Sequence, residues 1–315
     1  MKVLNDIDEL PSGLRYALAI GTFDGVHRGH VRVLKALTRA AAKGNAATVV
    51  LTFDPHPAAT LRGSSPDLLC DPAERLELFE HMGVDVAVVQ RFDRRFASQS
   101  AETFLARISA DRDLQALVLT SESAFGRDRS GGIADARRLA KRFGYRVIEV
   151  SHLEVGGAPI SSSRLRSLLA SGRLSDVRRL LGRRYSVVGT VVMGDQRGRT
   201  LGFPTANLHF DRDVALPANG IYAVRVAWDA DDPAARRHRR HGVASLGVRP
   251  TFETSGARVL EVYLFDFDGD LYGKRLRVEF VRRLRGEKRF ATSAALIRQM
   301  KRDALRARQI LDSLP

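Results

Sequence analysis

The first half of the chain alternates short apolar runs with segments of helical periodicity. Residues 16–20 are apolar, residues 31–42 repeat apolar positions at helical spacing, and residues 48–53 are β-branched and apolar. Further strands are predicted over 84–89, 114–119 and 145–150, and helices over 73–82 and 132–143. Strands that alternate with helices predict a parallel sheet of the doubly wound type.

After residue 184 the pattern changes to short alternating runs with Gly or Pro between them, which is typical of an antiparallel barrel or sandwich. The predicted strands cover residues 186–192, 221–228, 243–246, 259–267 and 275–281. Residues 293–314 predict one terminal helix. A chain of 315 residues suits two hydrophobic cores, so we predict two domains over residues 1–182 and 183–315.

Composition narrows the class of protein. The chain is 44% hydrophobic and 28% charged, with no low-complexity tract, which indicates a folded globular protein. Acidic residues near the start and the absence of a long apolar run predict neither secretion nor membrane spanning, so we expect a cytoplasmic protein. The single cysteine, Cys70, cannot form an internal disulfide, and we interpret it as a buried or incidental thiol.

The net charge of +15 is compatible with binding to nucleic acid, to a membrane surface or to small polyphosphate substrates. The densest basic cluster, residues 236–241, follows the acidic residues 229–232 between two apolar runs. We interpret this stretch as a solvated hairpin loop, with a nucleic-acid contact as the alternative. No helix-turn-helix, zinc-finger or aromatic RNA-binding signature accompanies it, so we expect small-molecule partners rather than nucleic acid or a membrane.

A glycine-bearing loop, Gly21-Thr22-Phe23-Asp24-Gly25, leads from the first predicted strand into the first predicted helix. Backbone N–H groups and the helix dipole face outward together there, which predicts an anion site. His27 and His30 are three residues apart around Gly29, so both imidazoles lie on one face and a phosphate can approach the backbone. The alternative is an ordinary loop with surface histidines.

A second group of phosphate donors is predicted where residues 160–166 read Ile-Ser-Ser-Ser-Arg-Leu-Arg. Ser162 and Ser163 stand at a helix start and Arg166 follows one turn later, an arrangement suited to β- and γ-phosphates. The alternative is a plain serine N-cap.

The segment from residue 194 to residue 207 combines spaced glycines, arginines and oxygen-bearing side chains. In chain order these are Gly194, Arg197, Gly198, Arg199, Gly202, Thr205 and Asn207. Glycines let backbone N–H groups approach a polyphosphate, and arginines can neutralise it. On an extended segment Thr205 and Asn207 point to the same side as hard oxygen ligands for Mg²⁺. A flexible Gly-Arg hairpin would not require the Pro-Thr-Ala-Asn ending.

Glu261 is an isolated carboxylate in the otherwise apolar residues 259–265. Burial there should raise its pKa, which makes Glu261 a candidate general base. A buried structural salt bridge is the alternative.

Taken together, these motifs resemble the prokaryotic bifunctional riboflavin kinase/FMN adenylyltransferase family, also called FAD synthetases. The first-half motifs that carry the resemblance are residues 21–30, 53–57 and 160–166, and those of the second half are residues 204–207, 220–222, 247–252 and 284–290. The resemblance implies a doubly wound nucleotidyltransferase domain followed by an antiparallel β-barrel riboflavin kinase domain with a terminal helix.

The resemblance also implies roles for particular residues. Glu261 would be the catalytic base of the kinase, and His27, His30 and Arg166 would act in adenylyl transfer. Riboflavin, FMN and ATP would be the substrates, with Mg²⁺ accompanying ATP, and the flavins would be substrate and product rather than a prosthetic group. The residues implied near the flavin are Arg285, Glu287 and Phe290.

One stretch departs from the family pattern. Where the family has G-x-D/N-F-x-F-G, residues 120–126 keep only the final Phe-Gly, with Glu122 at the Asp/Asn position and Ser123 at the first aromatic. An alternative hypothesis is therefore a riboflavin kinase whose N-terminal half is a degenerate module without efficient chemistry.

Overall fold

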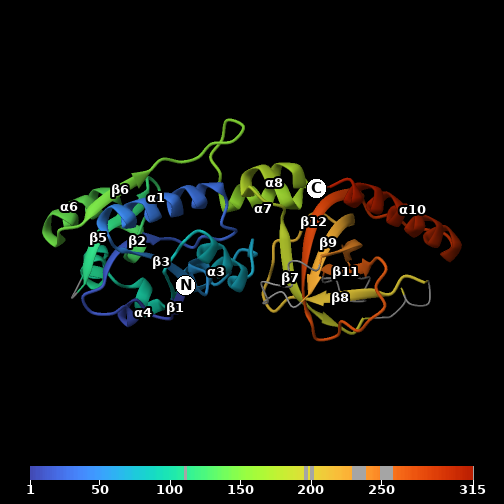
Figure 1. The fold of residues 1–315 in the computed structure, drawn as a ribbon, viewed down its shortest axis with the longest axis horizontal. Coiled ribbons are helices and arrows are strands. Elements are labelled where there is room, and N and C mark those ends of the chain that lie inside the picture. The colour runs from blue at the N-terminus through green and yellow to red at the C-terminus, as the bar shows by residue number, and fades with distance from the viewer. Residues whose placement is uncertain (110–111, 195–197, 199–201, 229–238, 249–257, 315) are drawn as a thin grey trace. The chain divides into compact units, whose positions relative to one another are not determined.

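The computed structural model describes residues 1–109, 112–194, 198, 202–228, 239–248 and 258–314 (Figure 1). The chain divides into two compact units. The first comprises residues 1–66 and 72–162, and the second comprises residues 67–71 and 163–315. The predicted fold class, a parallel-sheet α/β domain and an antiparallel barrel with a terminal helix, is confirmed.

The first unit is built on a parallel sheet of six strands in the order β1-β4-β3-β2-β5-β6. The strands are β1 (Lys2–Leu4), β2 (Arg15–Ile20), β3 (Ala47–Asp54), β4 (Val86–Arg91), β5 (Asp113–Thr120) and β6 (Arg146–Val150). From β2 the chain proceeds to β3 and β4 on one side and then returns to β5 and β6 on the other. The order therefore reverses between β2 and β5, where sheets of this kind bind ligands beyond the carboxyl ends of their strands.

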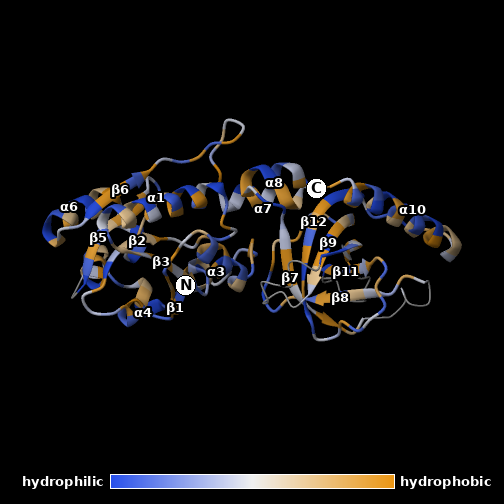
Figure 2. Cartoon of the chain, in the orientation of Figure 1, coloured by the Kyte–Doolittle hydropathy of each residue, from blue (hydrophilic) through white to orange (hydrophobic). Residues whose placement is uncertain are grey.

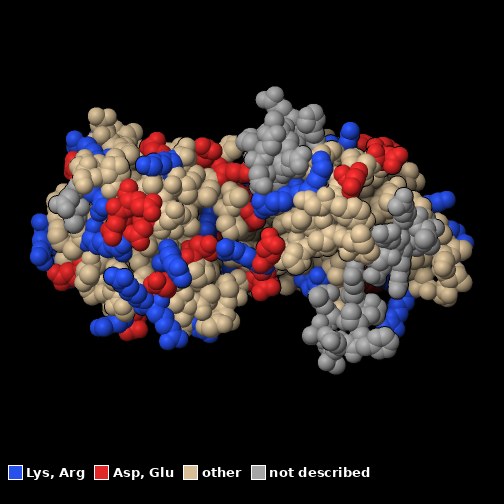
Figure 3. Space-filling model, turned by 90° about the horizontal axis from the view of Figure 1, so that it is seen from below, with Lys and Arg blue, Asp and Glu red and all other residues tan. Residues whose placement is uncertain are grey.

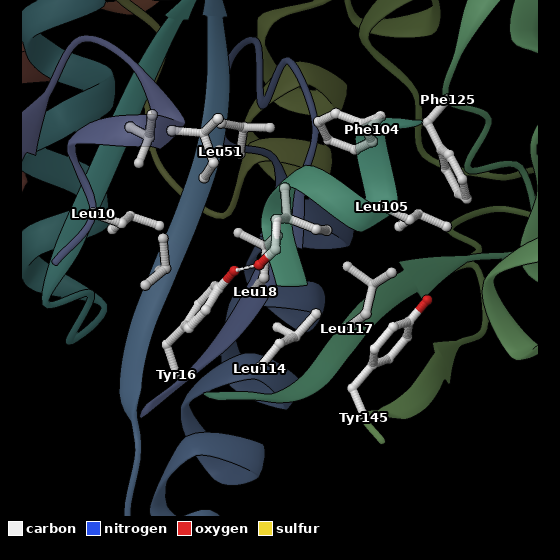
Figure 4. Close-up of a cluster of buried hydrophobic side chains, with 14 of the residues drawn as sticks. Leu10, Tyr16, Leu18, Leu51, Phe104, Leu105, Leu114, Leu117, Phe125 and Tyr145 are labelled. Atoms are coloured by element: carbon white, nitrogen blue, oxygen red, sulfur yellow. Dashed lines mark hydrogen bonds between the residues drawn. The ribbon is translucent and has the colours of Figure 1, made fainter. Parts of the chain in front are cut away.

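Helices cover both faces of this sheet, and each face has its own core. They are α1 (Arg28–Gly44), α2 (Pro57–Arg62), α3 (Pro72–His81), α4 (Arg94–Ala97), α5 (Ala101–Ser109) and α6 (Ile133–Phe143), with 3₁₀ turns η1 (Ile7–Glu9) and η2 (Arg127–Arg129). Because side chains alternate along a strand, Tyr16 and Leu18 enter one core whereas Ala17 and Ala19 enter the other. Figure 4 shows the first of these cores, where the Tyr16 hydroxyl donates to the Ile108 carbonyl.

The second unit contains a closed antiparallel barrel with strand order β10-β11-β8-β7-β12-β9. Its strands are β7 (Ser186–Val192), β8 (Thr205–His209), β9 (Gly220–Trp228), β10 (Arg240–Val248), β11 (Arg258–Leu264) and β12 (Arg275–Arg285). The helices of the chain's second half are α7 (Ser162–Ala170), α8 (Leu174–Leu181) and α10 (Ser293–Asp312). Helix α10 packs outside the barrel, where Ala307 and Leu311 contact Phe265 and Leu284.

Most predicted strands and long helices are present within two or three residues of their predicted bounds. Hydropathy along the helices is mixed, as Figure 2 shows for α1 and α8, which agrees with one apolar face against each core. Strand β1, the short helices α2 and α4, and the longer helices α5 and α8 were not predicted. Cys70 is buried, as expected. No helix among the described residues is long and apolar enough to cross a membrane.

Candidate active sites

Two side chains donate hydrogen bonds to the glycine-bearing loop that follows β2. The Thr22 carbonyl accepts a hydrogen bond from the Thr52 hydroxyl of β3 at 3.1 Å and from Nη1 of Arg75 of α3 at 3.0 Å. Phe23, only 2% exposed, packs edge-on against Phe79 of α3 with ring centroids 5.4 Å apart. The loop is therefore anchored to both β3 and α3 at the switch point of the sheet.

The two predicted histidines lie together at the start of α1. His27 is the N-cap, and its Nδ1 accepts from the His30 backbone N–H at 3.2 Å. The two rings stack with centroids 3.6 Å apart and an interplanar angle of 15°. A Cβ on Gly29 would lie 3.0 Å from the His27 ring, so glycine makes room for the stack. The shared face is confirmed, and His27 is buried rather than a surface histidine.

Burial sets the charge of His30. Its pKa is held well below the ordinary value, first by desolvation and then by the electrostatic influence of the neighbouring His27 and Arg75 side chains. Its Nδ1 is shielded from solvent and has no hydrogen-bond partner among the described residues. A second proton would create a buried donor without an acceptor, so His30 is neutral at physiological pH, with Nε2–H as its favoured donor. The bond to His27 Nδ1 likewise leaves Nε2 of His27 as the protonated nitrogen.

One serine of the predicted phosphate-donor segment, residues 160–166, forms a hydrogen bond with the same glycine-bearing loop. Ser162, the first residue of α7, donates from its hydroxyl to the Asp24 carbonyl at 3.0 Å across 138 residues of sequence. Ser163 and Arg166 belong to the second unit, where Arg166 Nε donates to the Asp67 carbonyl at 2.7 Å. The structure therefore joins Ser162 to the glycine loop, whereas the phosphate contacts assigned to Ser163 and Arg166 stay predictions.

The stretch that departs from the family pattern forms an ordered turn after β5. The Ser123 hydroxyl accepts from the Thr120 backbone N–H at 2.9 Å, and the Ser123 N–H donates to the Thr120 carbonyl at 2.9 Å. Phe125 is 8% exposed and belongs to the core drawn in Figure 4. Glu122 is exposed, with Oε1 3.7 Å from His152 Nε2. Phe125 is thus a packing residue, and Ser123 closes the turn where the family has an aromatic.

In the barrel, strand register brings the predicted kinase residues to one face. Glu261 of β11 lies directly opposite Asn207 of β8, and Tyr263 lies opposite Thr205. Cross-strand partners and residues two apart share a face, so Thr205, Asn207 and Glu261 point to the same side. The expected side-by-side placement of Thr205 and Asn207 is confirmed by this register.

The predicted burial of Glu261 is only partial. Leu260 and Val262 point into the barrel and are at most 1% exposed, whereas Glu261 between them points outward and is only partly buried. An apolar strand of a barrel has one face toward the core, so the neighbours of Glu261 along the chain did not describe its surroundings. Its register partner Asn207, by contrast, is 6% exposed.

Two of the predicted glycines contact the candidate metal ligands. A Cβ on Gly194 would overlap the side-chain amide of Asn207, and one on Gly198 would lie 3.3 Å from the Thr205 hydroxyl. Gly202 adopts φ +79, a left-handed conformation that favours glycine. Arg197 and Arg199 lie outside the described residues. The described glycines thus let the backbone reach the Thr205 and Asn207 side chains.

The predicted flavin residues have described partners in the second unit. Arg285 donates from Nε and Nη2 to Asp303 Oδ2 at 3.0 and 2.8 Å, and its guanidinium lies 5.8 Å from the Phe290 ring centroid. The Glu287 carboxylate accepts from Asn219 Nδ2 at 3.1 Å, and a Cβ on Gly247 would overlap it. Asn219 was not singled out from sequence, because no local pattern marks a partner 68 residues away.

Charge on the surface is mixed. On the face shown in Figure 3, acidic side chains lie among the basic ones of the first unit rather than leaving a continuous positive expanse. The basic stretch 236–238 lies outside the described residues, whereas β9 and β10, which flank it, pair antiparallel as a hairpin requires. No group of three or more His, Cys, Asp or Glu side chains suited to a metal occurs in the described part of the chain.

The first unit is a parallel α/β domain with stacked histidines in the loop at its switch point. The second is a closed barrel with Thr, Asn and Glu side chains on one outer face. Together they define a two-domain nucleotide-dependent transferase. Family models agree with this class: FAD synthetase matches residues 12–164 and riboflavin kinase matches residues 181–311. The chain belongs to the bifunctional riboflavin kinase/FMN adenylyltransferase family.

Relatives extend this likeness over the whole chain. The protein of that name from Escherichia coli strain K12 is 35% identical over 314 residues, covering 98% of this chain and 97% of the relative. The Haemophilus influenzae protein of the same name is 35% identical and covers 94% of each chain. A crystal structure described as a macrolide-efflux protein from Streptococcus pneumoniae has a TM-score of 0.85, 29% identity and 99% coverage of both chains.

Proposed function

We propose that this chain carries out two consecutive reactions of flavin metabolism. The barrel transfers the γ-phosphoryl group of ATP to the 5′-hydroxyl of riboflavin, which gives FMN and ADP. The α/β unit transfers the adenylyl group of a second ATP to FMN, which gives FAD and pyrophosphate. The observation that carries the proposal is the pairing of both family models in one chain, with relatives of the bifunctional name along nearly its full length.

In the kinase step, Glu261 takes the proton of the riboflavin 5′-hydroxyl as its oxygen attacks the γ-phosphorus in line with the departing ADP. The position of Glu261 supports this role, because strand register sets its carboxylate beside Asn207 on the outer face of the barrel. Thr205 and Asn207 offer a hydroxyl and an amide oxygen on the same face, a donor set that Mg²⁺ accepts together with ATP phosphates. Bound there, Mg²⁺ would supply positive charge to the phosphate oxygens.

Glu287, Arg285 and Phe290 would contact the flavin. The hydrogen bond from Asn219 orients the Glu287 carboxylate, and the contact with Gly247 keeps it close to the end of β10. Arg285 is already committed through Nε and Nη2 to Asp303 and through Nη1 to the Gly286 carbonyl, so its part in flavin binding would rest on its contact with the Phe290 ring.

In the transferase step, FMN attacks the α-phosphorus of ATP directly, and pyrophosphate leaves without a covalent enzyme intermediate. The Nε2–H groups of His27 and His30 would donate to the phosphate oxygens as negative charge develops. Residues 21–25 would bind the phosphates through the backbone, together with Ser162, whose hydroxyl contacts the same loop. A role for Ser163 and Arg166 at the pyrophosphate rests on the family resemblance alone. The match of the FAD synthetase model to residues 12–164 and the relatives of the bifunctional name support an intact site over the degenerate-module alternative.

The decisive experiment incubates the purified chain with riboflavin, ATP and Mg²⁺ and separates the flavins by chromatography over time. We expect FMN to form first and FAD to follow from it. Omitting Mg²⁺ should stop both products. FMN without FAD would establish the degenerate-module alternative, and the absence of both products would refute the proposed function.

A further inference from the structure

Arg75 is a buried cation without an acidic partner. Its residue is 7% exposed, and no carboxylate among the described residues lies within ion-pair distance of its guanidinium. Nη1 donates to the Thr22 carbonyl at 3.0 Å, while Nε is shielded from solvent and has no hydrogen-bond partner in the described part of the chain. Burying an uncompensated charge is costly, so a buried arginine of this kind requires a reason in function.

The hydrogen bond from Arg75 sets the direction of a peptide group in the glycine loop. The carbonyl of Thr22 points toward Arg75 and Thr52. In a trans peptide the following N–H points the opposite way, so the N–H of Phe23 faces away from α3. A loop that binds phosphate depends on such N–H directions, and this one is maintained from α3 across 53 residues of sequence.

We propose that Arg75 is a positioning residue of the adenylyl transfer, an inference that rests on that proposed reaction. Arg75 orients the Thr22–Phe23 peptide of the phosphate loop and places a fixed positive charge beside His30. The phosphates of ATP supply the negative charge that Arg75 lacks in the free protein. Arg75 therefore acts through the loop and through His30 rather than by touching the reacting atoms.

The charge of Arg75 also affects the ionisation of His30. After desolvation, the groups that lower the pKa of His30 are the titratable His27 at the start of the same helix and the charged Arg75 on α3. The buried carboxylates of these elements are Asp24 in the loop and Glu74 on α3. Removing the guanidinium should raise the pKa of His30 part of the way toward its ordinary value, because desolvation, the larger cause, remains.

Two substitutions separate the geometric and electrostatic contributions. Arg75→Gln removes the charge, and Arg75→Lys keeps it while replacing the guanidinium. The matched control is Arg39→Gln, an exposed arginine nine residues beyond His30 on α1. With purified full-length protein, FMN and ATP, Arg75→Gln should lower kcat for FAD formation roughly 10- to 100-fold, the range expected when reacting groups are misplaced. Arg75→Lys should recover part of that loss, and Arg39→Gln should match the wild type.

The pH profile of FAD formation distinguishes positioning from loss of folding. In Arg75→Gln the inflection caused by His30 should move to higher pH, since His30 then takes up its proton more readily, whereas Arg75→Lys should keep the inflection near that of the wild type. Riboflavin phosphorylation, measured in the same samples, should be unchanged because the barrel is a separate unit.

Three outcomes would overturn the inference. Wild-type kcat together with an unmoved pH profile in Arg75→Gln would show that Arg75 has no part in the step. An equal loss of kcat for FAD formation at every pH in both Arg75 variants would show that Arg75 serves only the stability of the fold. A wild-type chain that phosphorylates riboflavin but never forms FAD would refute the adenylyl transfer itself, and the inference with it.

Discussion

The surroundings of Glu261 follow from strand register rather than from the hydrophobicity of its neighbours along the chain. Residues on either side of it point into the barrel, while Glu261 points outward opposite Asn207. Gly194 and Gly198 lie close to the side chains proposed to bind Mg²⁺. A general base must be within reach of the substrate, and partial burial on the outer face is compatible with that role for Glu261.

At this scale we predict that Glu261→Gln retains riboflavin binding and loses FMN formation by roughly 10²- to 10⁴-fold, the usual contribution of a general base. The glutamine keeps the shape of the side chain but cannot accept the proton. Initial rates of FMN formation and quenching of riboflavin fluorescence measure the two effects. Asp268→Asn, an exposed acid-to-amide change in the same unit, is the control. Normal turnover by Glu261→Gln would show that the base is another residue.

Helix α10 is fixed to the barrel by a buried ion pair as well as by apolar contacts. Asp303 is 5% exposed and accepts two bonds from Arg285 of β12, and a further bond comes from Gln299 at 2.9 Å. Five residues further along the same helix, Arg308 pairs with Asp266, whose side chain is 78% exposed. Water screens the second pair far more than the first, so the two pairs should contribute unequally to stability.

We therefore predict that Asp303→Ala destabilises the barrel by about 3 kcal/mol, because Arg285 is left partly buried without its carboxylate. Asp266→Ala should change stability far less. The chain has one tryptophan, Trp228 on β9, so its fluorescence during urea unfolding reports on the barrel alone. Equal losses in the two variants would contradict the assigned difference between a buried and an exposed pair.

On the scale of the whole molecule, two units with separate cores carry two sites whose reactions share FMN. The net charge of +15 favours binding of these substrates, because ATP and FMN are both anionic. Each unit binds its own ATP in the proposed scheme. A defect in one site should therefore leave the chemistry of the other intact.

This independence predicts complementation between variants. His30→Ala should form FMN but no FAD, and Glu261→Gln should form FAD only when FMN is supplied. An equimolar mixture, given riboflavin and ATP, should produce FAD after a lag in which free FMN accumulates. Chromatography of the mixture over time measures the lag. Failure of the mixture, with each single variant behaving as described, would mean that FMN must pass between the sites of one chain.

Sequence alone determined the fold class, most strands and long helices, and the residue types of both candidate sites. The periodicity of 2.0 or 3.6 residues reports the local element and its buried face, so these features follow from neighbours close in the chain. Glycine-rich junctions between a strand and a helix are also local, which is why the loop at residues 21–30 could be located without a structure.

Only the tertiary structure decided which side chains serve those sites. The bond from Arg75 to Thr22 spans 53 residues, that from Ser162 to Asp24 spans 138, and that from Asn219 to Glu287 spans 68. The outward direction of Glu261 likewise depends on the closure of the barrel. Periodicity carries no information on which distant elements meet, because that is set by the packing of both cores and by the register of the strands.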